Sequence, residues 1–325
     1  MTYLVEVLPT NTNFDAEEKE SLLHAALSAG LNVDYGCTNG TCGHCKARLL
    51  EGELSQIRHH DFILTEAEKN AGDILMCCHS ARSNLKLEAS LATDEADIPL
   101  QEITTRIRRL EYVDDNTLRL YLRTPRTTTL RFMAGQHAIL SLDNHLQREL
   151  PIASCPCDGL NLEFHLHRDS SDVFTNAIFD CAKKSMPVQV TAPCHGITLV
   201  EKDPSPILFI AWGIGFAPVQ SLIEHCLSLE FQQQMLFHWV VHEHENHYAD
   251  SYCRSTDDAI DNFHYHPVKT ETAAEAIEEI LRWHNSLENW RGYIFAPPAI
   301  IDSVKVALFE KGLSKEKILS DPIVA

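Results

Sequence analysis

Hydrophobic and polar positions at the start of the chain alternate in short runs that predict a small mixed domain. Residues 3–7 alternate between apolar and polar side chains, which is typical of a half-buried strand, and the turn-rich residues 9–13 predict a hairpin to a second strand. Residues 21–27 carry apolar side chains at helical spacing, and Gly30 is of the type that commonly ends a helix. This part of the chain therefore predicts a strand hairpin followed by a short helix.

The middle of the chain has the pattern of an antiparallel sheet. Residues 106–124 alternate strongly between apolar and polar side chains, and further strand-like runs occupy residues 138–140 and 162–167. Short alternating strands separated by turns are typical of a small all-β unit. We expect an antiparallel β-barrel here.

From residue 206 onward the pattern changes to strands that alternate with helices. Apolar runs predict buried strands at 207–211, 235–241 and 292–295, and helical periodicity predicts helices at 218–229, 272–284 and 300–311. Strands and helices in alternation are the signature of a parallel sheet in an α/β domain.

A polar, acidic segment at residues 92–99 ends in proline and predicts a linker. With a length of 325 residues, the chain has room for two or three domains. We expect an α+β multi-domain protein with domains at residues 1–92, 100–203 and 204–325. A composition that is 44% hydrophobic and 22% charged fits a soluble globular protein.

The net charge and the cysteine content argue against several classes of binding partner and several cellular compartments. The formal net charge of −19 argues against nucleic acid and against anionic membrane surfaces. No apolar run is long enough to span a bilayer, and the amino terminus has no secretory signal pattern. The eleven cysteines lack the pattern of a small disulfide scaffold, so we expect a reducing cytoplasm.

Three cysteines stand at the spacing C-x4-C-x2-C, and a fourth lies further along the chain: Cys37, Cys42, Cys45 and Cys77. This is the plant-type ligand spacing for a [2Fe–2S] cluster, which needs four thiolates and a loop that wraps around the sulfides. Interspersed glycines allow the sharp bends of such a loop. Zinc is the first rival, but zinc sites favour paired C-x2-C units, and four unrelated thiols are the remaining alternative.

Cys78 directly follows Cys77 and complicates the choice of the fourth ligand. In an extended segment neighbouring side chains point to opposite faces, so we expect only one of the two to face the cluster. Residues 1 to about 90 resemble a plant-type ferredoxin domain of the β-grasp kind, on the order of its predicted elements and the cysteine spacing. That resemblance favours Cys77 as the ligand and leaves Cys78 as a small buried hydrophobe.

Residues 101–325 resemble the ferredoxin–NADP+ reductase superfamily. The motifs that carry the resemblance are F-x-[PA]-G-Q at 132–136, the position of R-x-Y-[ST] at 148–151, G-x-G-x-x-P at 213–218 and Y-x-C-G-P at 293–298. A ferredoxin domain placed before these motifs resembles the reductase components of bacterial oxygenases and the deoxysugar (glucoseen) reductases.

The resemblance implies two further cofactors, FAD and NADH or NADPH. The implied flavin-binding residues lie on the barrel and at the next helix start: Arg148, Leu150, Pro151, Ile152 and Thr175, with His165 and His167 on one strand face beside them. The implied nicotinamide-binding residues are Gly213, Gly215, Pro218, Phe295 and Pro297. Glu243 and Glu245 would repel a 2′-phosphate, which favours NADH.

Several positions depart from the family pattern. Leu150 and Pro151 replace the tyrosine and the hydroxyl residue of the flavin motif, which removes an aromatic stacking contact worth about 0.5–1.5 kcal/mol. Trp212 stands where the nucleotide loop usually has glycine, and Phe295 stands where the family has cysteine. His242, His244 and His247 follow one strand and could hold a metal, although a polar strand exit explains them better.

The resemblance implies an oxidoreductase that passes electrons from NAD(P)H through FAD and the cluster to a protein acceptor such as an oxygenase component. The cofactors supply the redox chemistry, and no side chain is expected to act as general acid, base or nucleophile. The alternative is a non-catalytic electron carrier or complex subunit, with a working ferredoxin domain and degenerate flavin and nicotinamide sites.

Overall fold

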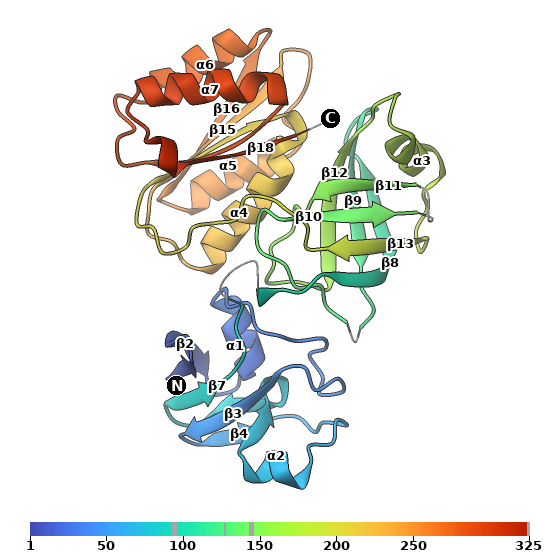
Figure 1. Ribbon diagram of the computed structural model, residues 1–325, viewed down its shortest axis with the longest axis vertical. Coiled ribbons are helices and arrows are strands. Elements are labelled where there is room, and N and C mark those ends of the chain that lie inside the picture. Colours follow the sequence, from blue (N-terminus) through green and yellow to red (C-terminus); the bar gives the residue numbers. More distant parts are fainter. Residues whose placement is uncertain (93–96, 127, 143–145, 324–325) are drawn as a thin grey trace.

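The computed structural model contains two five-stranded sheets, one six-stranded sheet and one small two-stranded sheet among its described residues. The first five-stranded sheet lies at the lower end of the longest axis, and the six-stranded sheet and the second five-stranded sheet lie side by side above it (Figure 1). The structure describes residues 1–92, 97–126, 128–142 and 146–323. We call the regions around the three main sheets the amino-terminal lobe (β1–β7), the middle lobe (β8–β13 with α3) and the carboxy-terminal lobe (β14–β18 with α4–α7). Half of the predicted linker, residues 93–96, lies outside the described residues.

The amino-terminal lobe is a mixed five-stranded sheet with strand order β2-β1-β7-β3-β5. Strand β1 pairs antiparallel with β2, which confirms the predicted hairpin. On its other side, β1 pairs parallel with β7. Ser21 caps the predicted helix, and Gly30 follows it with a φ of +74°. The elements are β1 (Thr2–Leu8), β2 (Thr12–Glu17), α1 (Leu22–Ser28), β3 (Lys46–Glu51), β4 (Leu54–Gln56), α2 (Glu66–Asn70), β5 (Asp73–Leu75), η1 (Met76–Cys78), β6 (His79–Ala81) and β7 (Leu85–Glu88).

The middle lobe is a six-stranded antiparallel sheet with strand order β11-β10-β13-β8-β9-β12. The sheet curls so that its two edge strands, β11 and β12, approach each other (Figure 1). The single alternating run predicted at 106–124 is two strands joined by a turn. The elements are β8 (Gln101–Tyr112), β9 (Thr117–Arg123), β10 (His137–Ser141), β11 (Gln147–Pro151), β12 (Asn161–His167), α3 (Val173–Cys181) and β13 (Pro187–Ala192).

The carboxy-terminal lobe is a parallel five-stranded sheet with strand order β16-β15-β14-β17-β18. Helices cover both faces: one apolar core includes residues of α4 and α5, and the other includes residues of α6 and α7 (Figure 1). The elements are β14 (Ile207–Trp212), η3 (Gly213–Gly215), α4 (Phe216–Ser228), β15 (Met235–His242), α5 (Asp250–Ala259), β16 (Phe263–Thr270), α6 (Ala273–Arg282), β17 (Arg291–Ala296), α7 (Pro298–Glu310), η4 (Lys315–Lys317) and β18 (Ile318–Pro322).

Three elements of this lobe were not among the predictions: α5, β16 and β18. Helix α5 is mostly polar and buries only Cys253 fully, so it lacks the apolar stripe on which helix prediction depends. Strand β16 contains Pro267 and two histidines, which weaken the strand pattern. Their places at and beside the sheet edges explain these mixed sequences.

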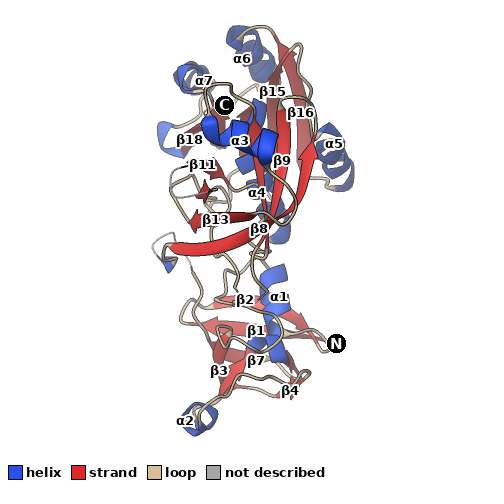
Figure 2. Cartoon of the chain, turned by 90° about the vertical axis from the view of Figure 1, so that its right-hand side faces the viewer, coloured by secondary structure: helices blue, strands red, loops and turns tan. Residues whose placement is uncertain are grey.

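The amino-terminal lobe sits beneath the other two (Figure 2) and is attached through the segment that leads into its cysteine loop. The side-chain amide of Asn32 donates to the carbonyl oxygen of Phe132 at 3.1 Å, and the Gly159 N–H donates to the Tyr35 hydroxyl at 3.3 Å. The Thr129 hydroxyl also donates to the carbonyl oxygen of Tyr35. Tyr35 is only 6% exposed. These contacts place the start of the cysteine loop against the middle lobe.

Among the described helices, none combines the length and the apolar character that a membrane crossing requires.

Candidate redox site

The cysteine loop buries three of its four predicted ligands. Cys37, Cys45 and Cys77 are each about 1% exposed, and Cys42 is half-buried. The backbone N–H groups of Thr41 and Cys42 each donate to Sγ of Cys37 at 3.4 Å. Backbone N–H groups directed at sulfur are the contacts that stabilise thiolates around an iron–sulfur cluster.

Two glycines of this loop have φ angles that other residues rarely adopt. Gly40 has a φ of +84° and Gly43 a φ of +80°. A Cβ on Gly43 would lie 2.3 Å from the Phe62 ring, so the loop also passes too close to its neighbour for a side chain. The sequence prediction of a tightly bent loop is confirmed in this geometry.

The four sulfurs form two neighbouring pairs, Cys37 with Cys42 and Cys45 with Cys77. Two irons that are each bound by two thiolates need such an arrangement. Burial by itself would raise the pKa of the Cys37 thiol, but hydrogen bonds from Thr41, Asn39 and Cys42 outweigh it and lower that pKa to about 6. Its contact with Cys77, together with burial, raises the pKa of Cys45. The donor set fits a [2Fe–2S] cluster.

Cys78 lies closer to the cluster loop than the sequence argument allowed. The expectation that Cys77 and Cys78 point to opposite faces assumed an extended backbone, and that premise is wrong because Met76–Cys78 is a turn of 3-10 helix. Their sulfurs are 3.6 Å apart. Cys78 is fully buried, as expected, and the pairing of Cys45 with Cys77 still favours Cys77 as the ligand.

The predicted flavin-phosphate residues meet at the start of helix α3. Nη1 of Arg148 donates to the Thr175 hydroxyl at 3.2 Å, and it also forms an ion pair with Asp172. Asp172 is the N-cap residue of α3: its carboxylate accepts from the Phe174 N–H at 3.0 Å and from the Thr175 hydroxyl. A guanidinium, a hydroxyl and a helix N-terminus therefore converge on one anionic group, which is the donor set that a diphosphate needs.

The other predicted flavin residues are placed differently. Leu150 is 3% exposed and Ile152 is fully buried, and both belong to the apolar core of the middle lobe. Pro151 is half-buried at the end of β11. Arg148 and Thr175 are thus brought together by the fold, whereas the side chains of Leu150 and Ile152 fill the core of the barrel-like sheet.

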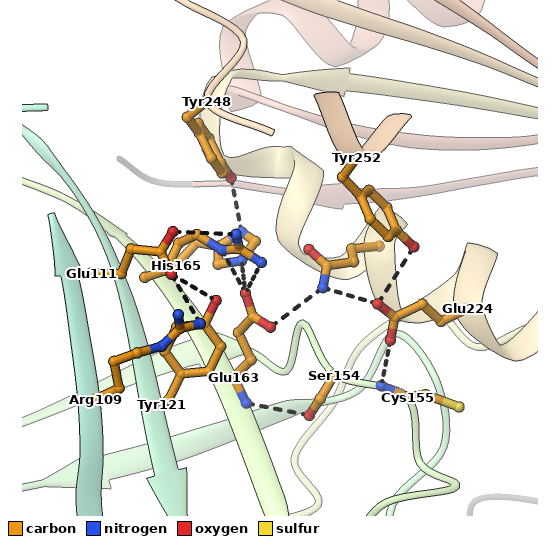
Figure 3. A network of polar contacts seen from close by, with 12 residues as sticks. Arg109, Glu111, Tyr121, Ser154, Cys155, Glu163, His165, Glu224, Tyr248 and Tyr252 are labelled. Carbon is orange, nitrogen blue, oxygen red and sulfur yellow. Dashed lines mark hydrogen bonds and ion pairs between the residues drawn. The ribbon is translucent and has the colours of Figure 1, made fainter. Parts of the chain in front are cut away.

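His165 lies in a polar network between the middle and carboxy-terminal lobes (Figure 3). Its Nδ1 is 2.8 Å from the Tyr248 hydroxyl, and its Nε2 is 2.8 Å from Oε1 of Glu163. Nη2 of Arg119 is 2.6 Å from the same Oε1. The side-chain amide of Gln220 on α4 extends the network by donating to Glu163 at 3.4 Å. The network joins strands β9 and β12 to the carboxy-terminal lobe.

Two carboxyl groups of this network have opposite pKa shifts. Burial would raise the pKa of Glu163, but hydrogen bonds and charge from His165 and Arg119 lower it to about 2. Burial raises the pKa of Glu224 to about 7, with a smaller contribution from the charge of Glu163. Glu224 accepts from the Cys155 N–H at 3.1 Å and from Gln220 at 3.1 Å, while Cys155 itself is disulfide-bonded to Cys157. The network therefore pairs an ionised with a protonatable carboxyl group.

The carboxyl ends of the parallel strands face a cavity of about 520 Å³ that the middle lobe closes from the other side. The strand order reverses between β14 and β17, and ligands of open α/β sheets bind at such a point. Of the predicted cofactor residues, His167, Gly213 and Pro297 line this cavity, together with Trp212. The cavity has the location expected for a nicotinamide nucleotide.

The remaining predicted nicotinamide residues lie behind this cavity. Phe295 is fully buried, and Pro218 is buried in α4. A Cβ on Gly215 would lie 2.6 Å from the carbonyl oxygen of Phe295, so Gly215 allows the loop to pack on β17. Glu245 lines the cavity, whereas Glu243 lines a neighbouring surface hollow.

The histidines after β15 separate in the structure. Nε2 of His242 is 3.1 Å from Glu271, and His244 lies near the same carboxylate, but all three groups are exposed. His247 instead contacts the carbonyl oxygen of Trp239 at 2.8 Å. This is the polar strand exit that the sequence favoured.

Sequence reasoning missed Asp172, Glu163 and Glu224. A signal exists for Asp172, because aspartate directly before a helical segment is a common N-cap. Glu163 and Glu224 each interrupt an apolar run, and a charged residue inside a buried element needs a partner. Each has one partner in the other lobe, Gln220 for Glu163 and the Cys155 N–H for Glu224, and no local pattern reveals such a contact.

A profile of the 2Fe-2S iron-sulfur cluster binding domain matches residues 5–82, which contain all four predicted ligands. Cysteine loop, curled antiparallel sheet and parallel sheet together define a class, the iron–sulfur electron-transfer reductases. The CDP-6-deoxy-L-threo-D-glycero-4-hexulose-3-dehydrase reductase of Yersinia pseudotuberculosis is 30% identical to this chain over 333 residues, which cover 100% of the chain and 99% of that protein. The chain belongs to the family of iron–sulfur reductases that includes this Yersinia protein.

More distant relatives and solved structures agree with this assignment. The reductase component of propane 2-monooxygenase from Gordonia sp. is 23% identical, with 98% of this chain and 96% of that protein covered. The Amycolatopsis cytochrome P450 reductase GcoB has the same fold, with a TM-score of 0.64, 22% identity and 98% of each chain covered. The prediction of an electron-transfer oxidoreductase with iron–sulfur, flavin and nicotinamide cofactors is confirmed for the family. The residues that hold the flavin and the nicotinamide in this chain stay predictions.

Proposed function

We propose that this chain takes electron pairs from NADH and delivers single electrons to a partner oxygenase or another iron enzyme. The observation that carries the proposal is the contact of the cysteine loop with the middle lobe. Tyr35, two residues before Cys37, accepts hydrogen bonds from Thr129 and Gly159 of that lobe. The bonded contact between the cysteine loop and the lobe that carries the flavin-phosphate donors supports electron transfer within one chain. Bound FAD would supply the conversion between paired and single electrons.

Arg148, Thr175 and the N-terminus of α3 are our candidates for holding the FAD diphosphate. Their donors already converge on an anion, the carboxylate of Asp172, and this supports the assignment. Because a diphosphate and a carboxylate repel each other, Asp172 must turn away from Arg148 when the diphosphate binds. We propose that Leu150 and Pro151 shape the flavin-facing end of β11 by apolar contact.

Trp212, Gly213 and Pro297 are our candidates for contacts with the nicotinamide nucleotide, since they line the cavity at the reversal of strand order. Glu245 and Glu271 line the same cavity. Two carboxylates there would repel the 2′-phosphate of NADPH, which supports NADH as the donor.

We further propose a division into a β-grasp ferredoxin domain at residues 1–92, a β-barrel flavin domain at 100–203 and a nucleotide-binding domain at 204–325. No sheet is divided between two proposed domains, which supports the division. Five cysteines outside the proposed cluster form no disulfide, in keeping with our expectation of a reducing cytoplasm: Cys78, Cys181, Cys194, Cys226 and Cys253.

An anaerobic titration tests the proposed function. Purified, iron–sulfur-loaded protein is incubated with FAD, freed of excess FAD by gel filtration and titrated with NADH while the visible spectrum is recorded. We expect flavin to co-purify and both the flavin and the iron–sulfur bands to bleach. An iron–sulfur spectrum without flavin and without response to NADH would contradict the proposal and establish the electron-carrier alternative.

A further inference from the structure

Two imidazoles and two carboxylates meet where the middle lobe touches the last strand of the carboxy-terminal lobe. Nδ1 of His195 lies 2.8 Å from Oε1 of Glu149, and Nδ1 of His137 lies 3.5 Å from the same oxygen. On the other side of its ring, Nε2 of His137 is 2.9 Å from Oδ2 of Asp321. None of these four side chains is used by the proposed electron path.

Burial makes this cluster unusual. His137 is 6% exposed and Asp321 is 4% exposed, yet Nε2 of His137 and Oδ2 of Asp321 have no hydrogen-bond partner of acceptable geometry. Buried polar atoms in native proteins are almost always hydrogen-bonded, because an unsatisfied group costs about 1–3 kcal/mol. The pair therefore calls for a ligand that orients the His137 ring.

The backbone brings these residues together reproducibly. Strands β10 and β11 pair so that Ile139 lies opposite Glu149, which puts Glu149 on the same sheet face as His137. The His137 N–H donates to the carbonyl oxygen of His195 at 2.9 Å, and the Cys194 N–H donates to the carbonyl oxygen of His137 at 2.8 Å. The two imidazole centroids are consequently 4.9 Å apart. Two of the donors thus lie on a strand pair, and the loop that carries His195 is bonded to that pair through its backbone.

We propose that His137, Glu149 and His195 form a binding site for a divalent transition-metal ion, with zinc as the best match. Nδ1 of each histidine lies within 3.5 Å of one Glu149 oxygen, and one nitrogen of each ring and one Glu149 oxygen all lie within 4.8 Å of one another. Zinc bonds of about 2.0–2.2 Å to nitrogen and oxygen place tetrahedral ligands about 3.3 Å apart, close to the separations seen here. Two imidazoles and one carboxylate leave the fourth position to water.

Asp321 has the position of an orienting group in this site. Histidines that bind a metal through one ring nitrogen commonly donate the other N–H to a carboxylate. A metal on Nδ1 of His137 would leave Nε2–H to Asp321 across the lobe boundary. The ion would then connect β10 and β11 of the middle lobe to β18 of the carboxy-terminal lobe.

A zinc titration of the full-length, iron–sulfur-loaded protein tests the site, with a chromophoric chelator as competitor. We expect one zinc ion per chain in addition to the iron. His195→Ala and Glu149→Gln should each weaken zinc binding at least about 10-fold, and Asp321→Asn should weaken it about 10-fold through the His137 ring. His244→Ala is the matched control, because His244 belongs to the fully exposed cluster with His242 and Glu271, and its zinc affinity should equal that of the wild type.

Cobalt substitution identifies the ligand atoms independently of affinity. Nitrogen and oxygen ligands give weak visible bands, whereas a thiolate adds strong charge transfer in the near ultraviolet. The unchanged iron–sulfur spectrum and melting temperature of each variant establish that it is folded; His195 is the variant of choice here because its side chain is 69% exposed. Absence of stoichiometric zinc binding, equal weakening by His244→Ala, or a thiolate spectrum would overturn the proposal.

Discussion

The cysteine loop and the flavin and nicotinamide anchors of this chain are organised in opposite ways. Three of the four predicted cluster ligands stand within nine residues, 37–45, and the loop itself supplies the N–H donors to sulfur. The flavin and nicotinamide anchors run from Arg148 to Pro297 and lie in two different lobes. A site made of residues close together in the chain can be recognised from their spacing in the sequence. A site made of residues far apart in the chain depends on how two lobes pack.

This difference explains where the family pattern is lost. A change at a cluster cysteine removes an iron ligand outright, so the spacing must stay intact for the site to exist. In the other lobes, packing can replace a lost contact: Asp172 occupies the phosphate donors, and Leu150 fills the core. The comparison predicts large, all-or-none effects at the loop and graded effects at the anchors.

The largest expected effect is at the fourth cluster ligand. Cys77→Ala should lose the cluster, with iron falling from about two atoms per chain to near zero, because one iron would keep a single thiolate. Cys78→Ala is the matched control and should keep both irons. Iron and acid-labile sulfide analysis of anaerobically purified protein measures the outcome. Loss of iron in Cys78→Ala with retention in Cys77→Ala would assign the ligand to the neighbouring thiol.

A smaller, graded effect is expected at the flavin anchor. Arg148→Ala should weaken FAD binding by about 10- to 100-fold, since a hydrogen bond to a charged group is worth about 1.5–3 kcal/mol. Asp172→Ser keeps an N-cap residue but removes the competing charge, so it should bind FAD more tightly than the wild type. Quenching of FAD fluorescence during titration measures both affinities.

Asp180→Ser provides the control for the Asp172 variant. It removes the same charge from the last turn of α3, where Asp180 pairs with Arg168. Its FAD affinity should equal that of the wild type. If both variants bind FAD equally more tightly, the effect of Asp172 is one of net charge and not of its position. If Asp172→Ser binds FAD no more tightly than the wild type, Asp172 does not compete with the diphosphate.

The stability of the folded protein should depend on pH through Glu224, which lies at the interface between the middle and carboxy-terminal lobes. Its pKa is raised to about 7 in the folded protein, so the folded state holds a proton that the unfolded state releases near pH 4.5. The contribution of Glu224 to the free energy of unfolding is therefore fully present below about pH 4.5 and is lost as the pH rises through 7. The total loss is at most about 3 kcal/mol. Glu224→Gln should remove this loss. Urea unfolding followed by tryptophan fluorescence at pH 5 and pH 8 compares the two proteins, and equal pH slopes would rule out the effect.

The smallest effect is expected in the choice of coenzyme. Glu245→Gln removes one carboxylate from the nucleotide cavity and should improve use of NADPH relative to NADH by about two- to fivefold, as expected for a solvent-screened charge. Glu243→Gln is the control, because Glu243 does not line that cavity. The ratio of kcat/KM values for the two coenzymes is the measurement. A preference for NADPH in the wild type would contradict the proposed role of both carboxylates.

Periodicity and local motifs anticipated much of the fold. Helix α1 ends as predicted near Gly30, and strands β14, β15 and β17 match their apolar runs closely. Helix α5 and strand β16 were not predicted because their sequences are mixed and their stability comes from neighbours. The argument about Cys77 and Cys78 failed for a similar reason, since a single turn of 3-10 helix replaced the assumed extended backbone.

Spacing along the chain and the family resemblance it supports were enough to predict the cluster ligands, the order of the three main sheets along the chain and the class of protein, because each depends on contacts between residues near one another or on a repeated pattern. Tertiary packing alone decided that Asp172 faces Arg148, that Gln220 links Glu224 to Glu163 across two lobes, and that His137 approaches Asp321. Those contacts join residues far apart in the chain, so their energies depend on how the sheets pack and on how much water that packing removes.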